Sequence, residues 1–143
     1  MIEAEQFAAI LIAAEQELEH GDLSAFLHDT ARPMVLQNVR DNFTSSVSPD
    51  GNQWPERKHV GDGHPLLIDR GDLLQSAVGG GAGHISQVQP REMALGTDDY
   101  KAAWHTKGTP NMPARPFMGA SDETEIEIAE QLADHLLPRA FGA

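Results

Sequence analysis

Apolar residues recur every three or four positions at the beginning of the chain, a pattern typical of an amphipathic helix. The spacing predicts a first helix from about Ile2 to His20, and Gly21 is expected to end it. Acidic residues near its start suit the positive end of the helix dipole. The positions that share its apolar face are Phe7, Ile10, Leu11, Ala14 and Leu18.

The same period continues into a second predicted helix that reaches about Ser45. Asp22 can cap its start by accepting a hydrogen bond from an early backbone N–H. Pro33 falls inside this helix. Because proline removes a backbone donor and clashes with the preceding turn, we expect a kink or a break there. The apolar positions are Leu23, Phe26, Leu27, Ala31, Met34, Val35, Val39 and Phe43.

The helical period vanishes from Ser46 to Pro65. Residues 48–52 read Ser-Pro-Asp-Gly-Asn, which predicts a tight turn because proline presets φ, aspartate bonds its own backbone and glycine accepts positive φ. Gly61-Asp62-Gly63 marks a second turn-rich point.

Short apolar runs and alternating segments then predict a small sheet. Residues 66–68 (Leu-Leu-Ile) suit a buried strand, and residues 73–78 suit a second. The second strand and residues 84–89 are expected to form a hairpin whose long, mobile tip is Gly79–Gly83. Residues 92–96 alternate apolar and polar and predict a further strand.

The rest of the chain predicts a short helix, an extended segment and a final helix. The short helix runs from Tyr100 to His105. Prolines at positions 110, 113 and 116 favour extended backbone after it. Ser121 or Asp122 caps the last helix, Asp122 with Glu125 resembles a capping box, and Pro138 is expected to end it.

These elements predict one α+β domain with two N-terminal helices, a small mostly antiparallel sheet with long loops, and a C-terminal helix. We expect a helical part over residues 1–46, a loop and sheet region over 47–120 and the last helix over 121–140. A length of 143 residues suits a single domain.

Charge and composition narrow the possible functions. The chain has 22 acidic and 10 basic residues, a formal net charge of −12, which argues against a nucleic-acid groove or an anionic membrane surface as partner. It has no cysteine, so disulfides and thiolate metal sites are excluded. No apolar run is long enough to span a bilayer, and the acidic start is unlike a signal peptide, so we expect neither a membrane anchor nor an export signal.

Two glycine-rich loops contain residues that could bind a ligand. The glycines of Gly79–Gly83 lack the spacing of a phosphate-binding loop, and no lysine lies near them. His59, Asp62 and His64 could bind a divalent cation, but they lie in a glycine-rich loop with no helix to orient them. We therefore expect solvated loop residues, no functional metal and no cofactor.

Catalytic patterns are also weak. The chain has no cysteine nucleophile and no Gly-x-Ser-x-Gly elbow. We interpret His105 beside Trp104 as a packed helix residue, and Asp98 and Asp99 as caps of the helix that begins near Tyr100. We predict no catalytic residue; a small hydrolase using His and Asp, or a monomeric binding module, are the alternatives.

One ordered series of residues is more informative than any single motif. It lies between Phe43 and Phe141, and it resembles the phage virion morphogenesis family, which includes tail-completion proteins. Its most specific segment is Pro-Ala-Arg-Pro-Phe-x-Gly at 113–119. The residues that carry the resemblance include Gly51, Trp54, Gly71, Tyr100, His105, Gly108, Arg115, Phe117 and Gly119.

The resemblance implies a structural subunit of the phage neck, at the head–tail interface of a virion assembled in the host cytoplasm. It implies a ring of about six copies between connector, adaptor or stopper proteins and the tail tube or terminator, with a tail terminator as the alternative role. Trp54 would anchor its loop, Gly51 and Gly71 would be turn positions, and Arg115 would be a hydrogen-bonding hub, which suits the rigid guanidinium fork.

The acidic excess adds one expectation about such a ring. DNA would pass through it without specific binding, and an acidic channel would repel the duplex rather than bind it. The alternative is that the carboxylates only keep helix surfaces soluble. The loop residues proposed to face the channel or to dock partners are Asp62, Gly80, Asp98 and Asp99.

Overall fold

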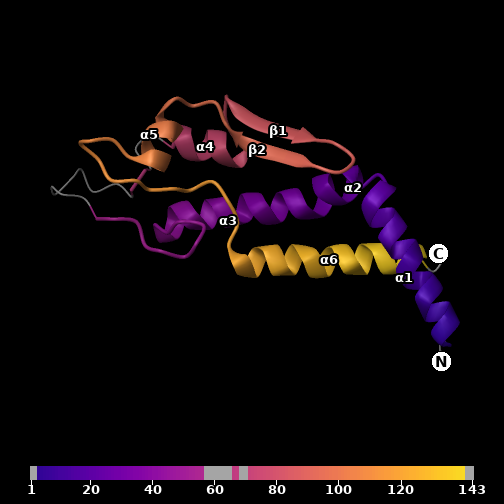
Figure 1. Cartoon of the computed structure of the whole chain (residues 1–143). Helices are drawn as coiled ribbons and strands as arrows, with labels where there is room; N and C mark the ends of the chain where they lie inside the picture. The colour runs from indigo at the N-terminus through magenta and orange to yellow at the C-terminus, as the bar shows by residue number, and fades with distance from the viewer. Residues whose placement is uncertain (1–2, 57–65, 68–70, 141–143) are drawn as a thin grey trace.

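The computed structural model describes residues 3–56, 66–67 and 71–140, without the side chains of 138–140. The molecule is elongated, with helix α1 (Ala4–His20) at one end and the short helix α5 (Lys101–Lys107) at the other (Figure 1). Two long antiparallel helices, α3 (Arg32–Ser45) and α6 (Asp122–Ala140), run between the ends. Helix α4 (Asp72–Val78) and a β-hairpin cover the face of α3 that lies away from α6.

The first predicted helix is confirmed as α1. Glu3 and Gln6 form a capping box at its start, and Gly21 follows its last residue. Helix α1 packs against α6, but none of its residues is buried. Its predicted apolar face is therefore only partly covered: Phe7, Leu11 and other apolar side chains stay exposed.

The second predicted helix is irregular before Pro33, where a kink or break was expected, but it is not broken. It begins as α2 (Ser24–Phe26), continues as a π-helical turn over Leu27–Ala31, and becomes α3 at Arg32. Pro33 lies in the first turn of α3, where its missing N–H costs no hydrogen bond of that helix. The predicted cap is present, since Asp22 Oδ1 accepts a hydrogen bond of 2.9 Å from the backbone N–H of Ser24.

The two strands predicted between positions 66 and 78 are wrong in the described residues. Leu66 and Leu67 lie in a turn, and Leu67 has φ 64°; Ile68 lies outside the described residues. Residues 72–78 form α4, a helix bounded by Gly71 and Gly79 in left-handed conformation. A short apolar run suits either a strand or a buried helix, and packing on α3 selected the helix.

The predicted strands at 84–89 and 92–96 are confirmed as β1 (His84–Val88) and β2 (Met93–Thr97). They pair antiparallel, with His84 opposite Thr97, and together form the α+β architecture. The tip of this hairpin is residues 89–92, so the prediction that the Gly79–Gly83 segment is a hairpin tip is wrong. That segment ends α4, with the Gly80 N–H bonded to the Gln75 carbonyl at 2.9 Å.

The C-terminal third follows the predicted order. Helix α5 is confirmed, and the proline-containing segment after it is non-helical. Ser121, one of the two predicted caps, provides the cap of α6, because its Oγ accepts a hydrogen bond of 3.2 Å from the Thr124 N–H. The predicted bounds of 121–140 agree with α6, but the expectation that Pro138 ends the helix is wrong, since α6 continues to Ala140.

The main core lies between α3, α4 and the segments that flank them, nearer to α5 than to α1. It is dominated by aromatic rings: Phe43 packs edge-on against Trp54, with ring centroids 5.9 Å apart, and against Phe117 at 4.9 Å. The other buried members are Val39, Leu73, Ala77 and Val78.

Candidate functional site

The motif residues at 113–119 form an extended segment that is held against the core at several points. Trp54 is 4% exposed, and its indole Nε1–H donates a hydrogen bond of 2.7 Å to the carbonyl of Pro116. Its backbone N–H donates to the Ser46 carbonyl at 2.7 Å, which closes the turn at 48–52. Trp54 therefore joins that turn to the extended segment.

Arg115 makes the second set of contacts. Its side chain is buried, and it donates from Nε to the Pro55 carbonyl at 2.9 Å and from a terminal nitrogen to the Glu56 carbonyl at 3.2 Å. Its backbone N–H donates to the His105 carbonyl. The guanidinium fork thus ties residues 55–56 to the segment, while its backbone ties the segment to α5.

Asn42 makes the third contact, and nothing in the sequence pattern singled it out. It is 2% exposed on α3, and its amide donates to the carbonyls of Phe117 at 2.9 Å and Gly119 at 3.3 Å. Its Oδ1 accepts a hydrogen bond of 3.2 Å from Asn38, one turn earlier. Two asparagines four residues apart beside a buried helix face are the signal that could have revealed this contact.

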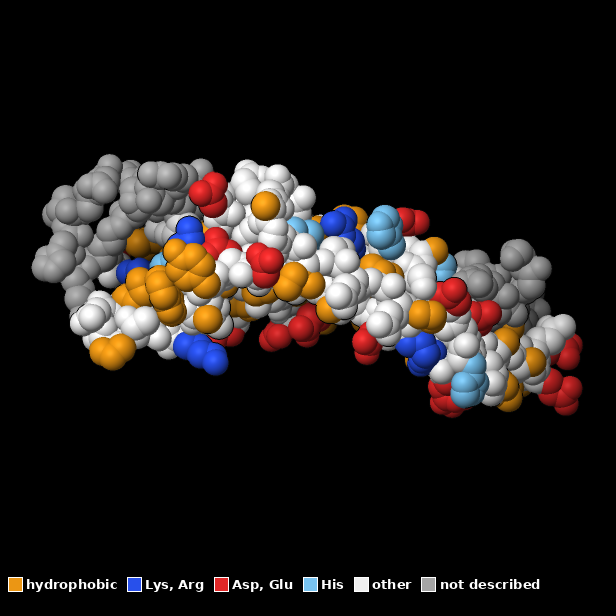
Figure 2. All heavy atoms as spheres, turned by 90° about the horizontal axis from the view of Figure 1, so that it is seen from above, with side chains coloured by type: hydrophobic (Ala, Val, Ile, Leu, Met, Phe, Trp, Pro, Cys, Tyr) orange, Lys and Arg blue, Asp and Glu red, His pale blue; other side chains and the backbone are white. Residues whose placement is uncertain are grey.

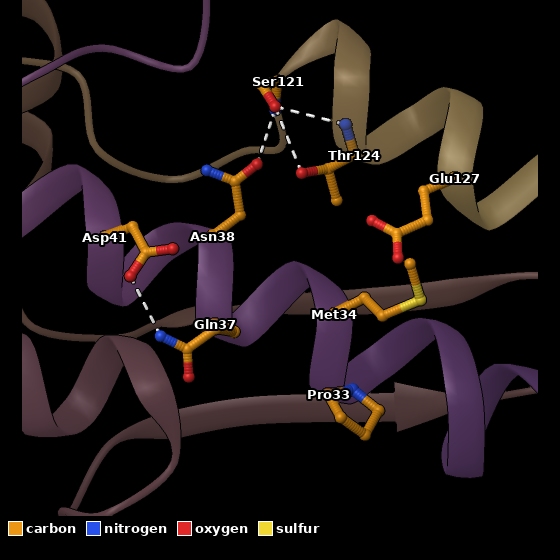
Figure 3. A pocket seen from close by; sticks show the side chains of 8 residues that line it. All are labelled: Pro33, Met34, Gln37, Asn38, Asp41, Ser121, Thr124 and Glu127. Atoms are coloured by element: carbon orange, nitrogen blue, oxygen red, sulfur yellow. Dashed lines mark hydrogen bonds between the residues drawn. The ribbon is translucent and has the colours of Figure 1, made fainter.

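Asn38 extends the network to the last helix, as Figure 3 shows. Its Oδ1 accepts a hydrogen bond of 2.7 Å from the backbone N–H of Ser121, the cap of α6. The cap hydroxyl also bonds Thr124 Oγ1 at 3.1 Å. The orientation of α6 on α3 is therefore coupled to the same asparagine pair that holds the extended segment.

Two motif glycines are required by the close approach of backbone. Gly119 has φ 149°, and a Cβ there would lie 2.9 Å from the ring of Pro49. Gly108 has φ 76°, and a Cβ there would lie 2.8 Å from the Ala114 backbone nitrogen. A larger residue at either position would displace the extended segment from its place.

His105 lies beside this segment on α5. Burial lowers its pKa, and the positive charges of Arg115 and Lys101 lower it further, while Asp99 opposes them. Its Nδ1 is buried and has no hydrogen-bond partner among the described residues. The lowered pKa favours the neutral imidazole at His105.

The other predicted site residues do not join this cluster. Gly51 lies in the turn at 48–52 with φ 91°, and Gly71 is the residue before α4. Tyr100 lies at the start of α5 and is 70% exposed. Gly80 lies at the end of α4.

The proposed channel acids have different surroundings. Asp98 is exposed, and its backbone N–H bonds the Gly83 carbonyl at 2.8 Å. Asp99 accepts the Lys101 N–H at 3.0 Å and lies 3.7 Å from its ammonium, so it caps α5. Asp62, with His59 and His64, lies outside the described residues.

The groove between α3 and α6 has a volume of about 450 Å³ (Figure 3). The two hydroxyl groups that line the groove, those of Ser121 and Thr124, belong to the cap of α6. The side-chain amide of Gln37, also in the lining, donates a hydrogen bond of 2.9 Å to Asp41. Among the described residues, no group of three or more His, Asp or Glu side chains is placed to hold a metal. The lining residues are Pro33, Met34, Gln37, Asn38, Asp41, Ser121, Thr124 and Glu127.

Comparison with known proteins gives one match. The model of the phage virion morphogenesis family matches residues 2–137 of the chain. No curated protein and no solved structure matches. Within the described residues, no helix is long and apolar enough to cross a membrane.

Proposed function

Because the chain belongs to the phage virion morphogenesis family, we propose that it is a tail-completion or head–tail joining subunit of the bacteriophage neck. The observation that carries this proposal is the family match over residues 2–137, which includes the anchored segment at 113–119. Family membership assigns the protein a structural or assembly role in the virion. The position in the neck and the ring-shaped assembly are our inference.

The arrangement of the described residues supports a role through shape rather than catalysis. The motif residues Trp54, Arg115 and Phe117 are buried and bind backbone carbonyls or the aromatic core. Such residues maintain a rigid scaffold, which suits a subunit that must fit between larger assemblies. The protein acts as a stoichiometric component, with DNA passing through the ring and no membrane involved.

The charge of the chain suits this position. A ring of about six copies, each with a formal charge of −12, creates a strong negative field near its surface, screened beyond roughly 8 Å at physiological salt. Loop acids such as Asp98 then repel the DNA backbone and keep the duplex free to move. Replacement of Asp98 by Lys tests this part through the rate of DNA ejection.

Virions made without the protein test the main proposal. Filled heads and finished tails should accumulate separately in electron micrographs, and purified protein added to them should restore infectious particles. The restored titre should saturate at about one ring per particle, and the protein should stay in the virion. Complete infectious virions without the protein would refute a joining role.

The same experiment separates the alternatives. A tail terminator would leave tails of uncontrolled length, whereas a joining protein leaves tails of normal length. An enzyme would restore particles at far less than one copy per virion and would not be retained. Each outcome is read directly from particle images and from the stoichiometry of the complementation.

A further inference from the structure

The outer side of α1 carries an apolar stripe that no element in the described part of the chain covers. Phe7, Leu11 and Leu18 are 55%, 49% and 43% exposed. Their spacings of four and seven residues place them on one side of the helix. Ile10 and Ala14, on the neighbouring side toward α6, are only half-buried. We call Phe7, Leu11 and Leu18 the α1 stripe.

The surroundings of the α1 stripe are acidic. Residues 3–31 contain no lysine or arginine. An apolar stripe in this setting favours a partner surface that combines apolar and basic groups. The seven carboxylate residues of this part of the chain are Glu3, Glu5, Glu15, Glu17, Glu19, Asp22 and Asp29.

Helix α5 carries exposed aromatic and basic side chains. Tyr100 and Trp104 are 70% and 50% exposed, and their rings pack edge to face with centroids 5.2 Å apart. The exposed Lys107 flanks the rings, whereas the half-exposed Lys101 lies 3.7 Å from Asp99 and the exposed Asp98 precedes the helix. We call Tyr100, Trp104 and Lys107 the α5 patch. Exposed tyrosine and tryptophan are the residue types that most often dominate binding interfaces.

The two surfaces lie at opposite ends of the elongated molecule (Figure 1). Figure 2 shows a cluster of hydrophobic side chains with basic and a few acidic ones at the α5 end, and hydrophobic side chains among mostly acidic ones toward the α1 end. The α1 stripe and the α5 patch therefore cannot meet within one chain. They can meet only between copies, where the aromatic rings of the α5 patch can pack on the apolar α1 stripe and Lys107 can face the acidic residues of α1.

We propose that the α1 stripe of one copy docks on the α5 patch of the next, so that copies join head to tail. The occupant is a second copy because one chain carries both complementary surfaces. A contact between two different surfaces of identical subunits propagates and closes into a ring when the rotation allows it. This inference rests on the proposed ring and names the residues that hold it.

Two variants test the contact in solution. Leu11→Asp disables the α1 stripe and leaves the α5 patch intact; Trp104→Asp does the reverse. Each alone should be monomeric, with self-association weakened roughly 30-fold or more. Mixed together they should form a one-to-one dimer, because one intact contact then exists between them. Ile126→Asp, at a site on α6 that is 60% exposed, should leave the wild-type assembly unchanged.

The outcomes separate this contact from its alternatives. Both variants should keep the circular dichroism spectrum of the wild type and, at dilutions where the wild type is monomeric, its unfolding temperature, since the altered side chains are exposed. A monomeric wild type at high concentration, a mixture that stays monomeric, or equal disruption by Ile126→Asp would each overturn the proposal. Disruption by Leu11→Asp alone would also overturn the proposal, because the stripe would then contact a surface of the second copy other than the α5 patch.

Cross-linking tests the same contact inside the virion, because the chain has no cysteine of its own. On oxidation, the Leu11→Cys/Trp104→Cys variant should give a ladder of covalent oligomers up to the full ring. Each single-cysteine variant should give no such ladder. A Leu11→Cys/Ile126→Cys variant is the control and should give no ladder. Absence of a ladder in joined particles would reject this contact while leaving the joining role intact, since that role is judged by the particles themselves.

Discussion

Replacement of Asn42 by leucine is expected to uncouple the extended segment from α3. Asn42 is buried and donates to the carbonyls of Phe117 at 2.9 Å and Gly119 at 3.3 Å. Leucine has the same branching and the same number of side-chain heavy atoms, so the substitution removes the amide without opening a large cavity. The two carbonyls, and the Asn38 amide that bonds Asn42, then lose their partner.

The loss of stability expected for Asn42→Leu follows from the hydrogen bonds that are lost and from the carbonyl groups left without a donor. Each net hydrogen bond contributes about 0.5–1.5 kcal/mol, and a buried carbonyl left without a partner costs about 1–3 kcal/mol. The Phe117 carbonyl is buried and the Gly119 carbonyl is partly buried, and leucine regains roughly 0.5 kcal/mol in helix propensity. We expect Asn42→Leu to lower the free energy of unfolding by about 2–3 kcal/mol, which lowers the unfolding temperature by roughly 8–12 °C.

Thermal and urea unfolding, followed by circular dichroism at one protein concentration, measure this change. Asn111→Leu, in an exposed turn, is the control and should shift stability by less than about 0.5 kcal/mol. Asn42→Asp should be more destabilising at neutral pH, because a carboxylate then faces two carbonyl oxygens, and should recover partly in acid, where the carboxyl can donate. If Asn42→Leu unfolds at the temperature of the control, the amide network does not hold the segment.

Three further substitutions probe other contacts. Trp54→Phe leaves the Pro116 carbonyl without its indole donor and should cost about 1–3 kcal/mol in urea unfolding; a cost below that of an exposed substitution would contradict the anchor role. Gly119→Ala, at φ 149° and 2.9 Å from a proline ring, should cost about 1–3 kcal/mol, whereas Gly96→Ala, with open space around it, should be nearly neutral; equal unfolding temperatures would refute the steric argument. The pKa of His105 is lowered in the folded state, so its contribution to the free energy of unfolding is complete above the unfolded pKa of about 6.5 and is lost as pH falls from there toward the folded pKa. His105→Gln should therefore reduce the loss of stability between pH 7 and 5. An unchanged pH profile would show that this group does not titrate as proposed.

Much of the fold was predictable from local patterns. The apolar period and caps predicted α1, α5 and α6 to within a few residues, and the Ser-Pro-Asp-Gly-Asn turn closes as expected. The strands of the hairpin followed from alternation between turn signals. The irregular turn before Pro33 followed from proline chemistry. These signals act over a few residues, so no knowledge of the rest of the chain is needed to read them.

Other features were decided only by packing. Residues 72–78 are a helix because α3 offers a surface for one side of it, and the apolar run itself is equally compatible with a strand. Likewise, the apolar positions of α1 indicated burial, yet the stripe stays exposed because α6 covers only the adjacent side. Exposure depends on what lies opposite a helix face, which its own period does not encode.

The candidate site was also predictable only in part from the sequence. The spacing at 113–119 marked Arg115, Phe117 and Gly119 as motif residues, but it did not reveal their partners. Asn42 lies 75 residues before Phe117 in sequence, and the two meet only because the extended segment lies along α3. Hydrogen bonds between such distant residues depend on distances and angles that exist only after the helices have packed.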